Sequence, residues 1–156
     1  EEGEPFDIAR DDLHRLVRRA ERAALERTAT VPNCAAIMSR DVLSIRGDAP
    51  WAEAHALLLA HDLRILPVVD GQGHITGIVE MHEPDHPLQN VSEMVSEPAV
   101  ARPGDSILKL IEPLTDGRHH AVLITDDAQR LVGLVTQTDM IAALARLAVS
   151  GAARQA

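Results

Sequence analysis

The stretch PVVDGQGHITGIV at residues 67–79 decides the fold, because LITDDAQRLVGLV at residues 123–135 matches it position by position. The offset between the two stretches is 56 residues (123 minus 67). It places three identical pairs in register, which are Asp70 with Asp126, Gly77 with Gly133 and Val79 with Val135. A repeat of this length indicates two copies of one supersecondary unit.

The segment before each stretch extends the repeat. IMSRDVLSIR at 37–46 aligns with EMVSEPAVAR at 93–102, and the same offset pairs Met38 with Met94. Each copy is expected to hold a short strand, a helix, a hairpin and a closing helix. The expected ranges are 42–46, 50–61, 65–69 and 75–79 in the first copy, and 99–102, 106–114, 121–125 and 131–135 in the second.

The closing helix of the second copy is expected to begin near Asp139, and Pro113 is expected to end the preceding helix early. The sequence thus predicts an α+β fold of two β-α-β-β-α repeats related by pseudo-twofold symmetry. Ahead of them, residues 7–27 carry apolar side chains at helical spacing, as an amphipathic helix does. The predicted organisation is a linker helix in 1–30, repeat 1 in 31–90, repeat 2 in 91–149 and a flexible tail in 150–156.

Composition excludes several functions. With 24 acidic and 15 basic residues the net charge is −9, and the chain has one Phe, one Trp and no Tyr, which argues against binding to nucleic acid polymers. No stretch is apolar over the roughly 20 residues that a membrane-spanning helix needs. The lone Cys34 forms no intrachain disulfide and suits the cytosol. No catalytic constellation is visible, so we expect no enzymatic activity.

Thr136 and Asp139 have the spacing of a helix-capping pair. A Thr hydroxyl followed three residues later by a carboxylate at a helix start is typical of a capping box, which stabilises the helix by about 0.5–2 kcal/mol. Taken in isolation, the spacing favours this structural role.

The repeat resembles the cystathionine-β-synthase-type (CBS) domain, and the pair resembles a Bateman module. The residues that carry the resemblance are IMSRDVLSI at 37–45, ILPVVDGQGHITGIV at 65–79 and, above all, RLVGLVTQTDMI at 130–141. The leading helix and the segment from Asp116 to Arg146 are also similar to the cytoplasmic tail of HPP-type membrane proteins. That second resemblance implies an attached transmembrane domain and a cytoplasmic location for this part.

The CBS resemblance implies a non-catalytic regulatory module that binds AMP, ADP or ATP, with or without Mg²⁺. The nucleotide site is expected in repeat 2: Asp139 accepts hydrogen bonds from the ribose, while Thr136 and the amides near Thr138 face the phosphate. Arg118, His119 and His120 lie on the loop that the family directs toward the phosphates; a metal site or exposed polar filler are the alternatives for the two histidines. The aliphatic cleft for adenine is expected to use Met94, Val95, Pro98 and Ala99.

MHEPDH at 81–86 matches the pattern H-E-x-x-H of zinc metalloproteases. Pro84 and Pro87 interrupt the helix that would bring the two histidines to one face, so we exclude a protease and retain only a non-catalytic metal contact. At the offset of 56, Glu80 stands opposite Thr136 and Glu83 opposite Asp139. An anion at position 80 predicts that the first repeat binds nucleotide poorly.

CBS pairs assemble as disc-like homodimers, and the resemblance implies the same here. The contact would use helical faces that include Leu57, Leu58, Ile107, Leu108, Ile141 and Leu144, which would serve equally well in the core of a single chain. The alternative function is a structural homodimerisation module without bound nucleotide. A metal-dependent hydrolase is the third and weakest.

Overall fold

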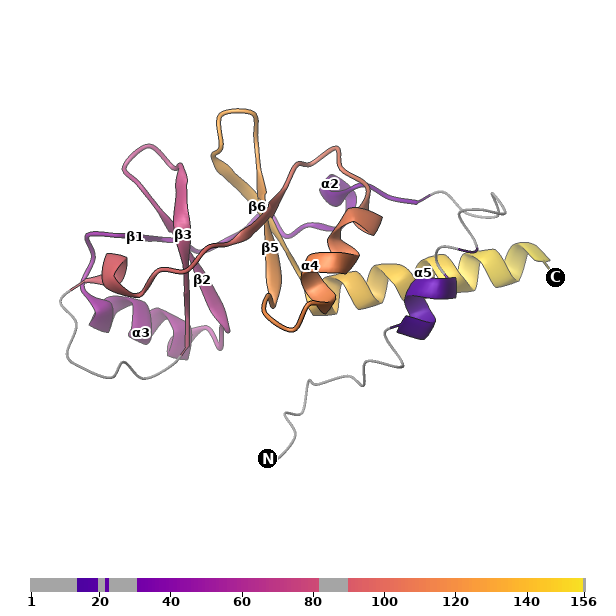
Figure 1. The fold of residues 1–156 in the computed structure, drawn as a ribbon, viewed down its shortest axis with the longest axis horizontal. Helices are drawn as coiled ribbons and strands as arrows, with labels where there is room; N and C mark the ends of the chain where they lie inside the picture. Colours follow the sequence, from indigo (N-terminus) through magenta and orange to yellow (C-terminus); the bar gives the residue numbers. More distant parts are fainter. Residues whose placement is uncertain (1–13, 20–21, 23–30, 82–89, 156) are drawn as a thin grey trace.

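The computed structural model describes residues 14–19, 22, 31–81 and 90–155. Within them, two three-stranded sheets stand side by side, as Figure 1 shows. The first holds β1 (Ile45–Arg46), β2 (Ile65–Val69) and β3 (Ile75–Glu80), and the second holds β4 (Ala99–Ala101), β5 (Ala121–Thr125) and β6 (Leu131–Thr136). In both, the first strand pairs parallel to the second and the third pairs antiparallel. This confirms the predicted α+β fold of two repeats.

Helices connect the strands. The chain forms α2 (Cys34–Ile37), α3 (Trp51–Ala60), the 3₁₀ helices η1 (Val91–Met94) and η2 (Ile107–Leu110), α4 (Ile111–Thr115) and α5 (Gln137–Gln155). α5 starts two residues before Asp139 and runs past Val149 through the segment that we assigned to a tail. Residues 14–19 and 22 are helical, and the remainder of the predicted helix 7–27 lies outside the described residues.

The prediction that Pro113 ends its helix was wrong in detail. Pro113 is the third residue of α4, and the helix continues to Thr115. A proline in the first turn costs no intrahelical hydrogen bond, because the N–H groups there have no partner within the helix. The Thr115 hydroxyl instead donates to the Ile111 carbonyl oxygen at 2.6 Å in the last turn.

Both hairpins turn in the same way. Asp70 Oδ1 accepts the backbone N–H groups of Gln72 and His74 at 2.8 and 3.0 Å. Asp126 Oδ1 accepts those of Ala128 and Arg130, both at 2.9 Å. These N–H donors lower the pKa of both aspartates. The predicted turns at 70–71 and 126–127 are therefore fixed by their own carboxylates.

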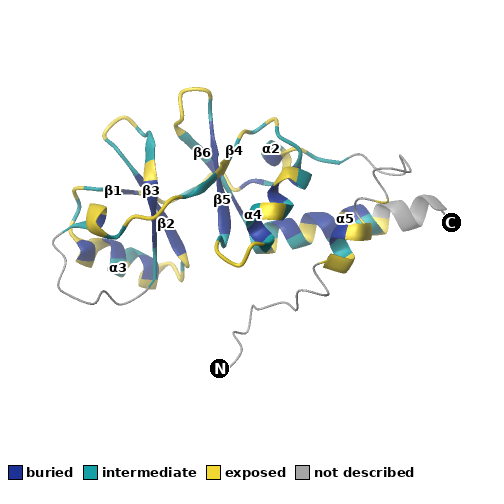
Figure 2. Cartoon of the chain, viewed as in Figure 1, coloured by how far each residue is buried: buried dark blue, intermediate teal, exposed yellow. Residues whose placement is uncertain are grey.

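Three hydrophobic clusters hold the fold, and Figure 2 shows the buried residues concentrated on the strands and inner helix faces. One packs α3 on the first sheet, a second packs α2, α4 and α5 on the second sheet, and the third joins the sheets through Ile65, Ile78, Ala121 and Leu123. Of the residues expected at a dimer interface, Leu58, Ile107 and Leu144 are fully buried within the chain. These three are core residues, which decides between the two alternatives for them.

Each repeat receives the leading segment of the other. The Ser39 N–H donates to the Leu134 carbonyl of β6 at 2.8 Å, and the Leu134 N–H donates back at 3.0 Å. Ser96 and Ile78 of β3 exchange the equivalent bonds at 2.8 and 3.0 Å. Because the segment before β1 lies on repeat 2 and the segment before β4 lies on repeat 1, the two repeats are tied crosswise.

The crosswise contacts correct the alignment of the leading segments. Ser39 and Ser96 are 57 residues apart (96 minus 39), whereas the strands keep the offset of 56. A Cβ at Gly133 would collide with Met38, and a Cβ at Gly77 would lie 3.0 Å from Val95 Cβ. The structural counterpart of Met38 is therefore Val95 and not Met94, since repeat 1 has one extra residue between Ser39 and β1.

Candidate functional site

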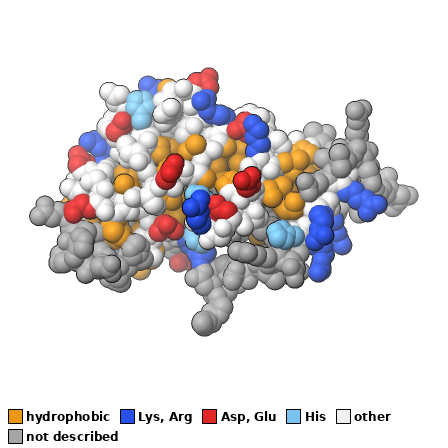
Figure 3. Space-filling view, viewed as in Figure 1, with side chains coloured by type: hydrophobic (Ala, Val, Ile, Leu, Met, Phe, Trp, Pro, Cys, Tyr) orange, Lys and Arg blue, Asp and Glu red, His pale blue; other side chains and the backbone are white. Residues whose placement is uncertain are grey.

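A cleft of about 500 Å³ lies between the two repeats. Three segments line it: Ser39, Asp41, Val42 and Leu43 before β1; His61, Leu63, Ile65 and Pro67 leading into β2; and Leu134, Thr136 and Asp139 at the junction of β6 and α5. Its size falls within the roughly 300–1,000 Å³ of small-molecule sites. Figure 3 shows, on one face of the molecule, hydrophobic side chains gathered across the middle with acidic side chains among them.

Thr136 and Asp139 form a reciprocal capping box at the start of α5. The Asp139 N–H donates to Thr136 Oγ1 at 3.1 Å, and the Thr136 N–H donates to Asp139 Oδ2 at 3.0 Å. This confirms the capping interpretation. The nucleotide interpretation is compatible with it, because the hydroxyl can still donate its proton and a carboxylate has two acceptor oxygens. The cap fixes both groups at a helix N-terminus, where anions are favoured.

The apolar wall of this cleft is made by residues that the sequence did not single out. Val42 and Leu43 come from the exchanged segment, Ile65 and Pro67 from β2, and Leu134 from β6. Sequence symmetry shows which residues are equivalent but not which repeat they pack against. We predicted the equivalent segment 94–99 for the adenine cleft because the sequence does not show that the leading segments are exchanged between the repeats.

Met94, Val95, Pro98 and Ala99 are not among the residues that line this cleft. Val95 and Ser96 contact β3 of repeat 1, where Val95 lies against Gly77 and Ser96 bonds to Ile78. Ala99 instead begins β4 and pairs with Val122 of β5 in the sheet of repeat 2. The four residues do not act as one group in the fold, since Met94 packs against the core of repeat 1 and Ala99 against the core of repeat 2.

Two of the three predicted phosphate donors are engaged with Asp116. Asp116 Oδ1 accepts the backbone N–H groups of Arg118 and His119 at 2.7 and 3.1 Å, and Oδ2 lies 2.9 Å from His119 Nδ1. The Arg118 N–H, followed by the His119 ring, lowers the pKa of Asp116 to about 2. The Arg118 side chain is 81% exposed and its Nε lies 4.0 Å from the same carboxylate.

His120 lies beside the start of α5. Its carbonyl accepts the N–H of Gln137, the first residue of α5, at 3.3 Å. Its Nε2 lies 4.0 Å from Glu80 Oε2 at the end of β3, and both side chains are a little over one third exposed. His120 thus faces a carboxylate of the other repeat. Thr138, in the first turn of α5, is exposed.

Metal ligands are sparse where the structure can be read. Within residues 14–19, 22, 31–81 and 90–155, no three His, Cys, Asp or Glu side chains gather to hold a metal ion. Residues 82–89, which carry His82, Glu83, Asp85 and His86, lie outside the described residues.

Cys34 is buried, and this burial raises the pKa of its thiol to about 11. A thiol with so high a pKa is a poor nucleophile and a poor metal ligand at neutral pH.

No helix in the described part of the chain combines the length and apolar character needed to cross a bilayer. A comparison with curated proteins gave no match. Among solved structures, the CBS domain of the bacterial CNNM/CorC family Mg²⁺ transporter in complex with ATP matches with a TM-score of 0.67 and 18% identity, over 85% of this chain and 97% of that one.

Two further structures show the same fold. CBSX2 in complex with AMP matches with a TM-score of 0.66 and 15% identity, over 74% of this chain and 98% of that chain. A CBS domain pair in complex with 5′-methylthioadenosine and S-adenosyl-L-methionine matches with a TM-score of 0.62 and 20% identity, over 71% and 94%. The family model described as CBS domain matches twice, at residues 34–83 and 89–146. The chain therefore belongs to the CBS domain family and is a tandem CBS pair.

Proposed function

We propose that this tandem CBS pair is a regulatory module that binds an adenine nucleotide in the cleft between its repeats. One observation carries the proposal: the cleft of about 500 Å³ combines an aliphatic wall with a fixed hydroxyl and carboxylate, Thr136 and Asp139, at the start of α5. A flat apolar base fits such a wall, and a ribose diol fits a carboxylate as donor to acceptor.

The three solved relatives support an adenosine ligand. The ligands in those structures are ATP, AMP, and 5′-methylthioadenosine with S-adenosyl-L-methionine, and all of them share adenosine. In our proposal Asp139 accepts the ribose hydroxyls, Val42, Leu43 and Leu134 contact the base, and Thr136 faces the 5′ group. Mg²⁺ would accompany only the more highly charged nucleotides.

The proposal assigns one nucleotide to each chain. Glu80 occupies in repeat 1 the position that Thr136 occupies in repeat 2, at the end of the matching strand. A carboxylate there repels a phosphate, whereas a hydroxyl donates to it. The segment with Glu83, the counterpart of Asp139, is outside the described residues.

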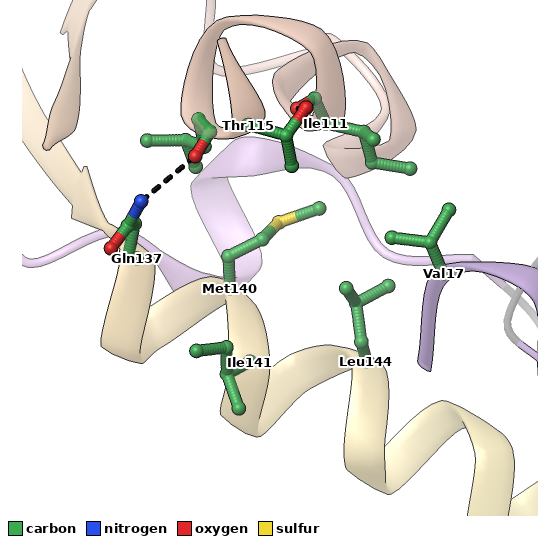
Figure 4. Close-up of a pocket in the computed structure, with 8 residues that line it drawn as sticks. Val17, Ile111, Thr115, Gln137, Met140, Ile141 and Leu144 are labelled. Atoms are coloured by element: carbon green, nitrogen blue, oxygen red, sulfur yellow. Dashed lines mark hydrogen bonds between the residues drawn. The ribbon is translucent and has the colours of Figure 1, made fainter. Parts of the chain in front are cut away.

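The route from the cleft to the rest of the protein is α5. Its first turn carries Asp139 and Met140, and Met140 and Leu144 line one small pocket together with Val17 of the leading helix, as Figure 4 shows. Gln137 Nε2 also donates to the Leu114 carbonyl at 2.8 Å, which fixes the start of α5 to α4. A ligand that shifts α5 would therefore shift the leading helix, provided it binds the two arrangements unequally.

The attached domain and the assembly belong to the proposal as well. The HPP resemblance of the sequence suggests a membrane-embedded output domain, with this pair on the cytoplasmic side. A homodimer is also proposed, and Leu59 on α3, which is 63% exposed, is a candidate for its surface. The alternative function is homodimerisation without a ligand, in which case no nucleotide would bind in the cleft.

Thermal unfolding tests the proposal. We would measure melting of the parent, Asp139→Ala and Glu83→Ala with AMP, ADP, ATP or zinc. A nucleotide at 100 times its dissociation constant should stabilise the parent by about 2.7 kcal/mol. Asp139→Ala should abolish the shift and Glu83→Ala should leave it nearly intact. Equal losses in both variants would refute one site per chain, and no shift with any nucleotide would favour the dimerisation module.

A further inference from the structure

Glu80 belongs to repeat 1, and its side chain faces His120, which precedes β5 of repeat 2. Its Oε2 lies 4.0 Å from His120 Nε2. The His120 carbonyl in turn accepts the N–H of Gln137, next to Thr136, at 3.3 Å. His120 thus connects the Glu80 carboxylate of repeat 1 to the start of α5, where Thr136 lines the cleft.

The three basic side chains expected to bind phosphate each have a carboxylate nearby. His119 is hydrogen-bonded to Asp116 at 2.9 Å, and Arg118 lies 4.0 Å from the same group. His120 faces Glu80. A carboxylate beside such a donor repels a phosphate, so the donor binds a phosphate less favourably than the same donor without a carboxylate nearby.

The cleft itself adds further negative charge. Asp41, on the exchanged segment, lines it together with Asp139. Asp41 lies in the stretch where repeat 1 has one residue more than repeat 2. Two carboxylates inside the cleft, together with the Glu80 carboxylate that faces His120, should disfavour each additional phosphate group on a ligand.

We infer that this cleft selects adenosine ligands by the charge of their 5′ end, preferring adenosyl compounds with at most one phosphate, and that Glu80 sets the preference. The inference rests on the proposed function, because it assigns a charge selectivity to the same cleft. It makes Glu80 a specificity residue for the site of repeat 2, in addition to its effect in repeat 1.

The test uses probes that share the nucleoside and differ only in the 5′ group: 5′-amino-5′-deoxyadenosine, adenosine, AMP and ATP. Dissociation constants are measured by calorimetry on the full chain without divalent cations. The parent should bind adenosine and the amino compound about tenfold more tightly than ATP, with AMP between them. Raising the salt concentration should narrow this range, because screening weakens repulsion.

Two variants assign the preference to its residues. Glu80→Gln should strengthen ATP binding about tenfold and change adenosine binding by less than about twofold. Asp41→Asn should shift ATP in the same direction. Glu53→Gln, on the exposed first turn of α3, removes the same charge outside the cleft lining and should leave the ratio unchanged.

The outcomes separate the two proposals. If the probes bind but the parent prefers ATP to adenosine, or if Glu80→Gln and Glu53→Gln change ATP affinity equally, the charge selectivity is refuted and the nucleotide site stands. If none of the four probes binds, both proposals are refuted.

Discussion

The ends of β3 and β6 occupy equivalent places in the two repeats and carry opposite chemistry. β6 ends at Thr136, directly before α5. The Thr136 hydroxyl accepts the Asp139 N–H at 3.1 Å and so caps the start of that helix. β3 ends at Glu80, whose carboxylate faces His120 of the other repeat at 4.0 Å. The strands before these ends have the same register within each sheet. The two repeats therefore keep the same strand pairing but differ at the end of the third strand, where repeat 2 has a helix cap and repeat 1 has an anion.

The largest effect should come from substitutions in the core. They also test whether the two repeats unfold as one cooperative unit. Leu58 on α3 and Leu114 on α4 are equivalent at the offset of 56 and are 0% and 2% exposed. Each change to Ala should cost about 2–5 kcal/mol. Denaturant unfolding followed by circular dichroism should show a single transition, shifted by either variant, because the repeats are tied crosswise.

Two transitions, with Leu58→Ala moving only one and Leu114→Ala only the other, would mean that the repeats unfold independently. In that case the crosswise bonds of Ser39 and Ser96 would contribute little to cooperativity.

The next largest effect isolates the cap that distinguishes repeat 2. Thr136→Val keeps the shape of the side chain but removes the oxygen that accepts the Asp139 N–H. We expect a loss of about 0.5–2 kcal/mol without ligand, measured by thermal unfolding, because one helix N–H loses its partner. Thr136→Ser is the matched control and should retain most of the stability. Equal losses in Ser and Val would show that the hydroxyl is not the stabilising group.

The smallest effect concerns acid, and it compares the two hairpin turns. The backbone N–H groups of the turns hold the pKa of Asp70 and Asp126 below the ordinary value. The pKa of Asp116, in the loop before β5, is lowered to about 2. A group with a lowered pKa in the folded state stabilises the fold above the pKa of the unfolded chain, about 3.9 for Asp. This stabilisation is lost as the pH falls toward about 2 for Asp116.

Asp70→Asn and Asp126→Asn should each weaken the dependence of the melting temperature on pH in this acid range, and by similar amounts, because the turns accept equivalent N–H groups. The amide oxygen of Asn can still accept those N–H groups at every pH. A pH profile that is unchanged in both variants would contradict the role of these carboxylates.

The sequence predicted the hairpins well and the cleft only in part. Strands β2 and β5 match the predicted ranges, because β-branched runs bounded by an Asp-led turn have a clear local signal. The exchange of leading segments has no local signal, since it depends on hydrogen bonds between residues almost one hundred positions apart, such as Ser39 and Leu134. For that reason the sequence pointed to Thr136 and Asp139, which line the cleft, but not to Val42 and Leu43, which line it as well.

The loop before β5 shows a second limit of sequence reasoning. Residue types at 118–120 indicated phosphate donors, but the hydrogen bond between His119 and Asp116 is visible only in three dimensions. The sequence shows which side chains could donate to a ligand, whereas only the folded structure shows which of them already bond to another residue of the chain.

The crosswise pairing of Ser39 with β6 and Ser96 with β3 also limits how this protein can move. Two repeats that each hold a piece of the other cannot open like a hinged lid without breaking main-chain hydrogen bonds on both sides. Any response to a bound ligand must therefore be a small rotation of one repeat relative to the other that keeps these bonds, similar to a change in the twist of a sheet. If the proposed ligand binds, we expect the module to respond to the shape of the ligand between its repeats and not to close over it.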